Sequence, residues 1–192
     1  ITMSAVTSTA NVTLTSSAGN ILDDNNASAV GAGLLSLTAN ASGKGVGTGA
    51  NGALDTDASS ITANVGTGGV NIHDVGSVTV NTPTVASGGS VTVAADVALS
   101  TGGAITLTSG NINLSAKNGL NVNHNIETTS SGNITLNADS DEDIVGVYTQ
   151  AGGGVYVMTN PGGDITIQTA AGYTLGTVDA GGVFTLLVTG DL

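Results

Sequence analysis

The 192-residue chain contains no cysteine and no tryptophan, and its basic residues are two lysines, with no arginine. Without cysteine the chain has neither a disulfide framework nor a thiolate zinc site. Fourteen acidic residues give a formal net charge of −12, which removes the basic surface that binds phosphate backbones, so we expect no nucleic-acid partner. Aromatic residues make up only 2% of the chain, too few for the core of an ordinary globular domain.

Long apolar runs are also missing. The longest, such as Leu186-Leu187-Val188, fall far short of the roughly 18 residues of a membrane-spanning helix, so no transmembrane segment is expected. Disorder is disfavoured because 40% of the residues are hydrophobic. The chain opens on Ile1-Thr2-Met3 in mid-pattern, with no signal peptide, so we expect a segment of a longer protein.

What the chain does contain is a repeat. Short segments that alternate Val, Ile or Leu with Thr, Ser or Asn recur along it. Their first apolar residues are Val70, Val91, Ile112, Ile134 and Val155, which lie 21, 21, 22 and 21 residues apart. Each unit holds up to three such segments, separated by Gly, Asn or Asp.

Alternation on a strand places neighbouring side chains on opposite faces. We therefore expect Val91, Val93, Ile105 and Leu107 to face inward. An outward row should read Thr13, Ser36, Asn71, Thr92, Asn113, Thr135 and Tyr156. A chain that returns every 21 residues can stack each strand on its equivalent in the previous unit. The pattern predicts an all-β parallel β-helix, or β-solenoid, with about 21 residues per coil and no significant helix.

We expect a single β-solenoid segment over residues 1–192. Residues 70–169 hold the most regular repeats, and residues 35–69 form an irregular or enlarged coil around a glycine-rich stretch. A second enlarged coil is expected over residues 155–182, with its additional length around residues 170–173.

The repeats carry a family resemblance. Residues 103–114 read GAITLTSGNINL and residues 132–138 read GNITLNA. These segments resemble the repeats of filamentous haemagglutinin-like exoproteins, which are large bacterial adhesins exported by two-partner secretion in Gram-negative organisms. The resemblance is clear over residues 70–169 and looser elsewhere. It implies a right-handed β-helical shaft at the bacterial cell surface or outside the cell, although the motifs of the family's secretion domain are not found in this sequence.

The densest group of ionisable residues is Asp139, Asp141, Glu142 and Asp143. Carboxylates at alternate positions suit Ca²⁺, which takes oxygen ligands, yet the glycine and the final glutamate of an EF-hand loop do not follow Asp139. A weak Ca²⁺ site and a solvated acidic turn are both compatible with this segment. We expect no other cofactor.

Other polar groups suggest no site. Turn chemistry explains Asp23-Asp24-Asn25-Asn26 and Asp55-Thr56-Asp57. His73 and His124 are expected to be surface histidines, since neither has a second metal ligand nearby in the sequence.

We identify no catalytic residue. Glycosidases need two carboxyl groups about 5–9.5 Å apart flanking a sugar, whereas the acidic pairs here are adjacent on turns. The leading hypothesis is a non-enzymatic, structural or adhesive segment of a large extracellular exoprotein that contacts a glycan or protein receptor on a host or neighbouring cell. The alternative is a subunit of a fibre, sheath or surface layer that associates end to end. A polysaccharide-binding or polysaccharide-cleaving β-helix is a remote third option.

Overall fold

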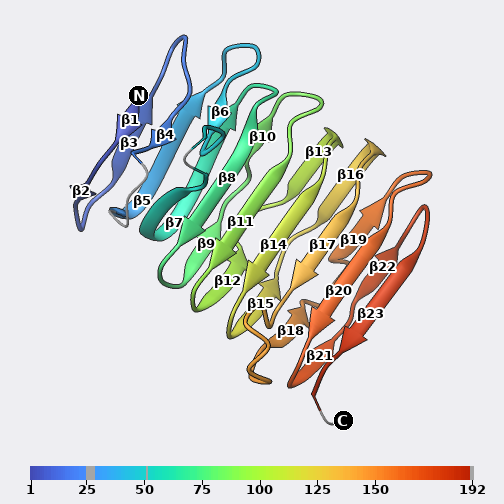
Figure 1. The fold of residues 1–192 in the computed structure, drawn as a ribbon. Coiled ribbons are helices and arrows are strands. Elements are labelled where there is room, and N and C mark those ends of the chain that lie inside the picture. Colours follow the sequence, from blue (N-terminus) through green and yellow to red (C-terminus); the bar gives the residue numbers. More distant parts are fainter. Residues whose placement is uncertain (25–28, 51, 191–192) are drawn as a thin grey trace.

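The computed structural model describes residues 1–24, 29–50 and 52–190 and is a β-solenoid of about eight turns (Figure 1). Every pairing between its named strands is parallel. The described residues include no helix, and hence none long and apolar enough to cross a membrane. The predicted all-β solenoid is confirmed.

Each coil contributes strands to three rows, which we name A, B and C in chain order. Row A consists of β1 (Thr2–Met3), β4 (Leu22–Asp23), β6 (Gly45–Val46), β8 (Gly69–Asp74), β11 (Val91–Ala95), β14 (Ile112–Ala116), β17 (Ile134–Asn137), β20 (Ile165–Thr169) and β23 (Phe184–Val188). The long strands β5 (Val30–Ala39) and β7 (Leu54–Val65) run through rows B and C, and β7 also begins in row A beside β8.

The rest of row B is β2 (Val6–Thr7), β9 (Val78–Val80), β12 (Ala98–Thr101), β15 (Gly119–Val122), β18 (Val147–Gln150) and β21 (Gly172–Thr174). Row C contains two ladders. The first joins β3 (Val12–Thr15), β5, β7 and β10 (Thr84–Val85), and the second joins β13 (Ile105–Ser109), β16 (Ile126–Ser131), β19 (Tyr156–Thr159) and β22 (Thr177–Asp179).

The core is a line of stacked aliphatic side chains. Val91 pairs with Val70 on one side and Ile112 on the other, and Ile112 pairs with Ile134. The four residues predicted to face inward are at most 1% exposed, namely Val91, Val93, Ile105 and Leu107. Full burial of each such side chain contributes about 1.5–3 kcal/mol, so stability accumulates coil by coil along the axis.

The Gly-Asn-Ile motif forms the corner that leads into row A. The Asn111 side-chain oxygen accepts a hydrogen bond from the Asn133 N–H at 2.9 Å, and the Asn133 oxygen accepts one from the Asp164 N–H at 2.9 Å. Gly132 has a φ of 136°, and a Cβ there would overlap the carbonyl oxygen of Gly110 in the preceding coil. The motif repeats because each corner rests directly on the one before it.

After Ile134 the register differs from the prediction. Ile134 pairs with Ile165, 31 positions later, and not with Val155. Val155 precedes β19, which pairs with β16 in row C. The predicted origin at Val155 is wrong because the segment Val155-Tyr156-Val157 alternates like a row A strand but lies one row earlier in the coil.

The additional length therefore lies in residues 134–164 and not around residues 170–173. It is divided between the loop that joins β17 to β18 and the loop that joins β18 to β19. Larger side chains fill this coil. Tyr148 is fully buried beside Leu120, its hydroxyl donates to the Gln150 side-chain oxygen at 3.2 Å, and the Gln150 amide donates to the Thr177 carbonyl at 2.9 Å.

Within residues 35–69 the irregularity is an insertion between β6 and the start of β7, which both pair with β8 in row A. Val46 pairs with Val70 and Leu54 pairs with Ile72, so neighbouring inward positions of row A are separated by the glycine-rich stretch between Val46 and Leu54. The expected irregular coil thus keeps its place in the stack.

The outward polar row is divided between faces. Thr13 and Ser36 lie in row C and Tyr156 lies in the second ladder of that row, so the single row predicted from the sequence is wrong. Row A instead carries Asn71, Thr92, Asn113, Thr135, Thr166 and Thr185 in register. Row B carries Ser60, Thr79, Ser100, Asn121, Thr149 and Thr174. Two faces therefore each present a line of hydroxyl and amide groups.

Candidate cation site

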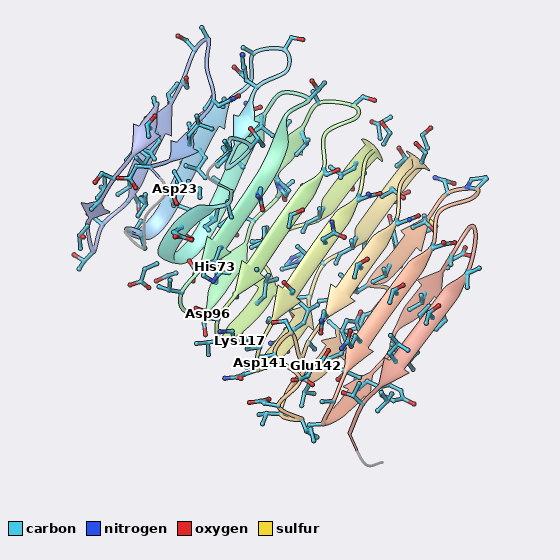
Figure 2. The ribbon with its side chains drawn as sticks, viewed as in Figure 1. Asp23, His73, Asp96, Lys117, Asp141 and Glu142 are labelled. Carbon is cyan, nitrogen blue, oxygen red and sulfur yellow. The ribbon has the colours of Figure 1, made fainter. Side chains whose placement is uncertain are left out.

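Negative charge is concentrated at the corner between rows A and B. In Figure 2, Asp96, Asp141 and Glu142 lie along one edge of the solenoid; Asp96 follows β11, and Asp141 and Glu142 share the loop that follows β17. Ten of the 14 acidic residues belong to this corner, namely Asp23, Asp24, Asp55, Asp57, Asp74, Asp96, Asp139, Asp141, Glu142 and Asp143.

Three of the four predicted ligands come together in the loop between β17 and β18. One carboxylate oxygen from each of Asp139, Asp141 and Asp143 lies within 4.8 Å of the other two. Asp139 is fully buried, whereas Asp141 and Asp143 are exposed. Glu142 does not belong to this group, and its φ of 60° turns the backbone between the two exposed aspartates.

The Asp139 carboxylate is buried with only partial compensation. Neither of its oxygens accepts a hydrogen bond. Burial raises the pKa of Asp139, and the negative charges of Asp143 and Asp141 raise it further, while the nearby backbone amides of Asp143 and Ile144 offset part of this effect. The ionised form of Asp139 is thus destabilised unless a positive charge joins the cluster.

Asp74 shows how the same corner satisfies a buried aspartate. Asp74 is also fully buried, yet one oxygen accepts hydrogen bonds from the Thr56 hydroxyl at 2.8 Å and the Ala58 N–H at 2.9 Å. Its other oxygen accepts one from the Gly76 N–H at 3.0 Å. Asp74 therefore closes its turn without an ion.

Further along the corner, His73 bridges two aspartates from neighbouring coils. Its Nδ1 lies 2.9 Å from Asp55 Oδ1 and its Nε2 lies 3.2 Å from Asp96 Oδ1. Carboxylates only accept hydrogen bonds, so both ring nitrogens must donate and the imidazole is charged in this arrangement. Burial lowers the pKa of His73, but the hydrogen bonds to Asp55 and Asp96 outweigh it and the net shift is upward.

Lys117 completes this line of charges. Its ammonium lies 2.8 Å from the same oxygen of Asp96 that His73 contacts. The hydrogen bond from Lys117 and then that from His73 lower the pKa of Asp96.

Sequence reasoning treated His73 as a lone surface histidine and missed both contacts. The sequence signal that could have revealed them is the spacing. Asp55 and Asp96 lie 18 and 23 positions from His73, and each separation is close to the length of one coil.

The two remaining groups singled out in the sequence are His124 and the acidic turn that begins at Asp23. His124 Nδ1 lies 3.1 Å from the Thr101 carbonyl, and its backbone N–H donates to the Thr101 hydroxyl. Asp23 is 4% exposed, and burial raises its pKa. Asn25 and Asn26 of the same acidic turn lie outside the described residues.

No protein-family model, curated protein or solved structure matches the chain. The similarity to filamentous haemagglutinin-like repeats is thus a resemblance of the GNITL-type segments alone. Conclusions about function depend on the solenoid and on the chemistry of its faces and corners.

Proposed function

We propose that the chain is a non-enzymatic β-helical segment of a large extracellular bacterial exoprotein, in which it acts as a rigid spacer and a lateral contact surface. The observation that carries this proposal is the unbroken register of row A from β8 to β23, where each strand pairs with its equivalent in the next coil. At about 4.8 Å per coil, eight coils span on the order of 40 Å.

The two polar rows support a role in contact. Thr, Ser and Asn side chains repeat at the strand spacing on the outer faces of rows A and B, and most are partly exposed. Such lines of hydroxyl and amide groups can hydrogen-bond to a glycan or protein receptor on a host or neighbouring cell. The resemblance of the repeats favours Gram-negative secretion and a place at the cell surface.

The spacer function is tested by changing the length of the rod. Residues 91–111 run from Val91 to the position before its row A equivalent, Ile112, and so form one complete coil. Inserting four further copies after residue 111 should lengthen the particle by about 20 Å in small-angle scattering, at constant cross-section. A glycine-serine insertion of equal length is the control. A wider particle, or loss of the folded state, would contradict the proposal.

The extracellular location has a separate test. Antibodies raised against the folded chain should label intact cells of the organism that produces it. Labelling that requires permeabilised cells would place the chain inside and overturn this part of the proposal.

A second candidate function is end-to-end assembly. It is favoured by the exposed apolar side chains Val183, Phe184 and Leu187 on and beside β23, a strand whose partner among the described residues is β20. An open strand edge can pair with a second copy. Long unbranched filaments in negative-stain microscopy of the purified chain would support the subunit function, whereas single short rods would support the spacer.

A further inference from the structure

We propose that Asp139, Asp141 and Asp143 bind a Ca²⁺ ion that holds the loop between β17 and β18 against the corner of the solenoid. This inference goes beyond the spacer function and stands on the geometry of this one loop. In Figure 2 the labelled Asp141 and Glu142 mark the position of the loop at the edge of the molecule.

The first argument is the buried carboxylate. Asp139 is 0% exposed and neither of its oxygens has a hydrogen-bond partner, although Asp74 at the same corner is equally buried and accepts three hydrogen bonds. The fold therefore can supply donors to a buried aspartate at this corner. At Asp139 it supplies two further carboxylates beside the backbone amides of Asp143 and Ile144, and a bound cation would neutralise the excess negative charge.

The second argument is the spacing of the oxygens. Ligand oxygens on opposite sides of Ca²⁺ are about 4.6–5.2 Å apart, since each Ca–O distance is about 2.3–2.6 Å. The three carboxylate oxygens here lie within 4.8 Å of one another, so they fit around one such ion. Mg²⁺ needs stricter octahedral geometry at Mg–O distances of about 2.0–2.1 Å, whereas Ca²⁺ tolerates the flexible geometry that two solvent-exposed aspartates offer.

The third argument is that, among the described residues, no lysine or histidine side chain forms an ion pair with Asp139, Asp141 or Asp143. The Lys117 ammonium forms its ion pair with Asp96 at 2.8 Å, and this hydrogen bond and the charge of Asp96 are the main causes of its raised pKa, to which the charge of Asp141 adds only a small part. The three carboxylates thus keep an excess of negative charge, which a divalent ion would neutralise.

The exposed side of the site predicts its affinity. Asp141 and Asp143 are open to solvent, so water would complete the six to eight oxygen ligands of Ca²⁺. Sites of this kind in extracellular modules bind with dissociation constants of about 10⁻⁴–10⁻³ M, which matches the calcium level outside cells.

The test is calorimetric titration of the full chain with CaCl₂, together with thermal unfolding followed by far-ultraviolet circular dichroism. We expect saturable binding and a melting temperature that rises with Ca²⁺ but not with equal concentrations of MgCl₂ or with NaCl of matched ionic strength. Asp141→Asn and Asp143→Asn should each weaken Ca²⁺ binding at least about tenfold. Glu142→Gln is the matched control, because it removes one negative charge from the same exposed loop without removing a ligand.

Asp139→Asn gives an independent signature. In EDTA this variant should melt at a higher temperature than the wild type, because it removes an only partly compensated buried charge, and added Ca²⁺ should leave it unchanged. Absence of saturable binding to the wild type would overturn the proposal. So would equal losses in Glu142→Gln and Asp141→Asn, which would show general charge screening. The exposed positions 141 and 143 keep the test decisive even if the change at the buried position prevents folding.

Discussion

The two buried aspartates of the acidic corner should respond in opposite directions to one and the same substitution. Asp74 is the last residue of β8 and Asp139 lies just after β17, so both are fully buried where a row A strand ends. The Asp74 carboxylate accepts three hydrogen bonds, whereas neither oxygen of Asp139 accepts one with good geometry, although the backbone amides of Asp143 and Ile144 lie nearby. In the absence of divalent cations, Asp74→Asn should destabilise the protein and Asp139→Asn should stabilise it, although each change replaces one oxygen by an amide of nearly equal size.

The expected loss at Asp74 follows from its three hydrogen bonds. An asparagine keeps one acceptor oxygen, which can receive the Thr56 hydroxyl and the Ala58 N–H. Its amide group must then face the Gly76 N–H, so one hydrogen bond becomes a contact between two donors. A hydrogen bond to a charged group contributes about 1.5–3 kcal/mol, and the two remaining bonds weaken as the charge is lost, so we expect a loss of about 2–4 kcal/mol.

The expected gain at Asp139 follows from its electrostatics. Burial and the neighbouring carboxylates raise its pKa above the ordinary value of 3.8, so the protonated form favours the folded state. That contribution is fully present below pH 3.8 and is lost as the pH rises through the raised folded-state pKa. At neutral pH the ionised group therefore destabilises the fold, and its removal should return about 1–3 kcal/mol.

Urea unfolding at neutral pH in EDTA, followed by far-ultraviolet circular dichroism, measures both effects, and equal slopes in wild type and variants would validate the comparison. A pH series adds a second readout, because Asp139→Asn should flatten the loss of stability above pH 3.8. If both variants lose stability by similar amounts, Asp139 has partners that the structure does not show, and the reasoning is refuted.

Three further predictions concern other parts of the solenoid. The charged form of His73 should stabilise the fold fully below pH 6.5, and this contribution should be lost as the pH rises through its raised pKa. The loss of urea stability above pH 6.5 should therefore be absent in His73→Gln. An unchanged pH profile of stability in that variant would contradict this prediction. Gly132→Ala, at φ 136° with its Cβ against a backbone carbonyl, should lose more urea stability than Gly153→Ala, which has φ 75° and open space and should lose about 1–2 kcal/mol. Asn133→Ala should speed hydrogen exchange at the Asp164 amide by removing its acceptor, with little change at amides of distant coils.

The fold could be predicted because its chemistry is local and repeated. Alternation fixes the two faces of each strand, and a period near 21 residues brings equivalent positions together, as the pairing of Val91 with Ile112 shows. The register failed at Val155 because alternation identifies a strand without identifying its row. Only the pairing of Ile134 with Ile165 distinguishes a long coil from two regular ones.

The site was predictable only where its residues are adjacent in sequence. Asp139, Asp141 and Asp143 share one loop, and their spacing was informative. The burial of Asp139 depends on where the enlarged coil places its loop, which composition and period leave open. The contacts of His73 were missed for a related reason, since its partners come from the coils before and after it.

The acidic corner combines these observations into one electrostatic arrangement. Asp55, His73, Asp96 and Lys117 come from four successive coils, and their charges alternate in sign from one coil to the next. Opposite charges at the coil spacing attract along the axis, whereas slipping one coil past its neighbour would separate each pair, so the line favours the observed register. The alternation ends at the enlarged coil, where three carboxylates follow Lys117 and its ammonium is already held by Asp96. A bound cation at this loop would supply the next positive charge in the series.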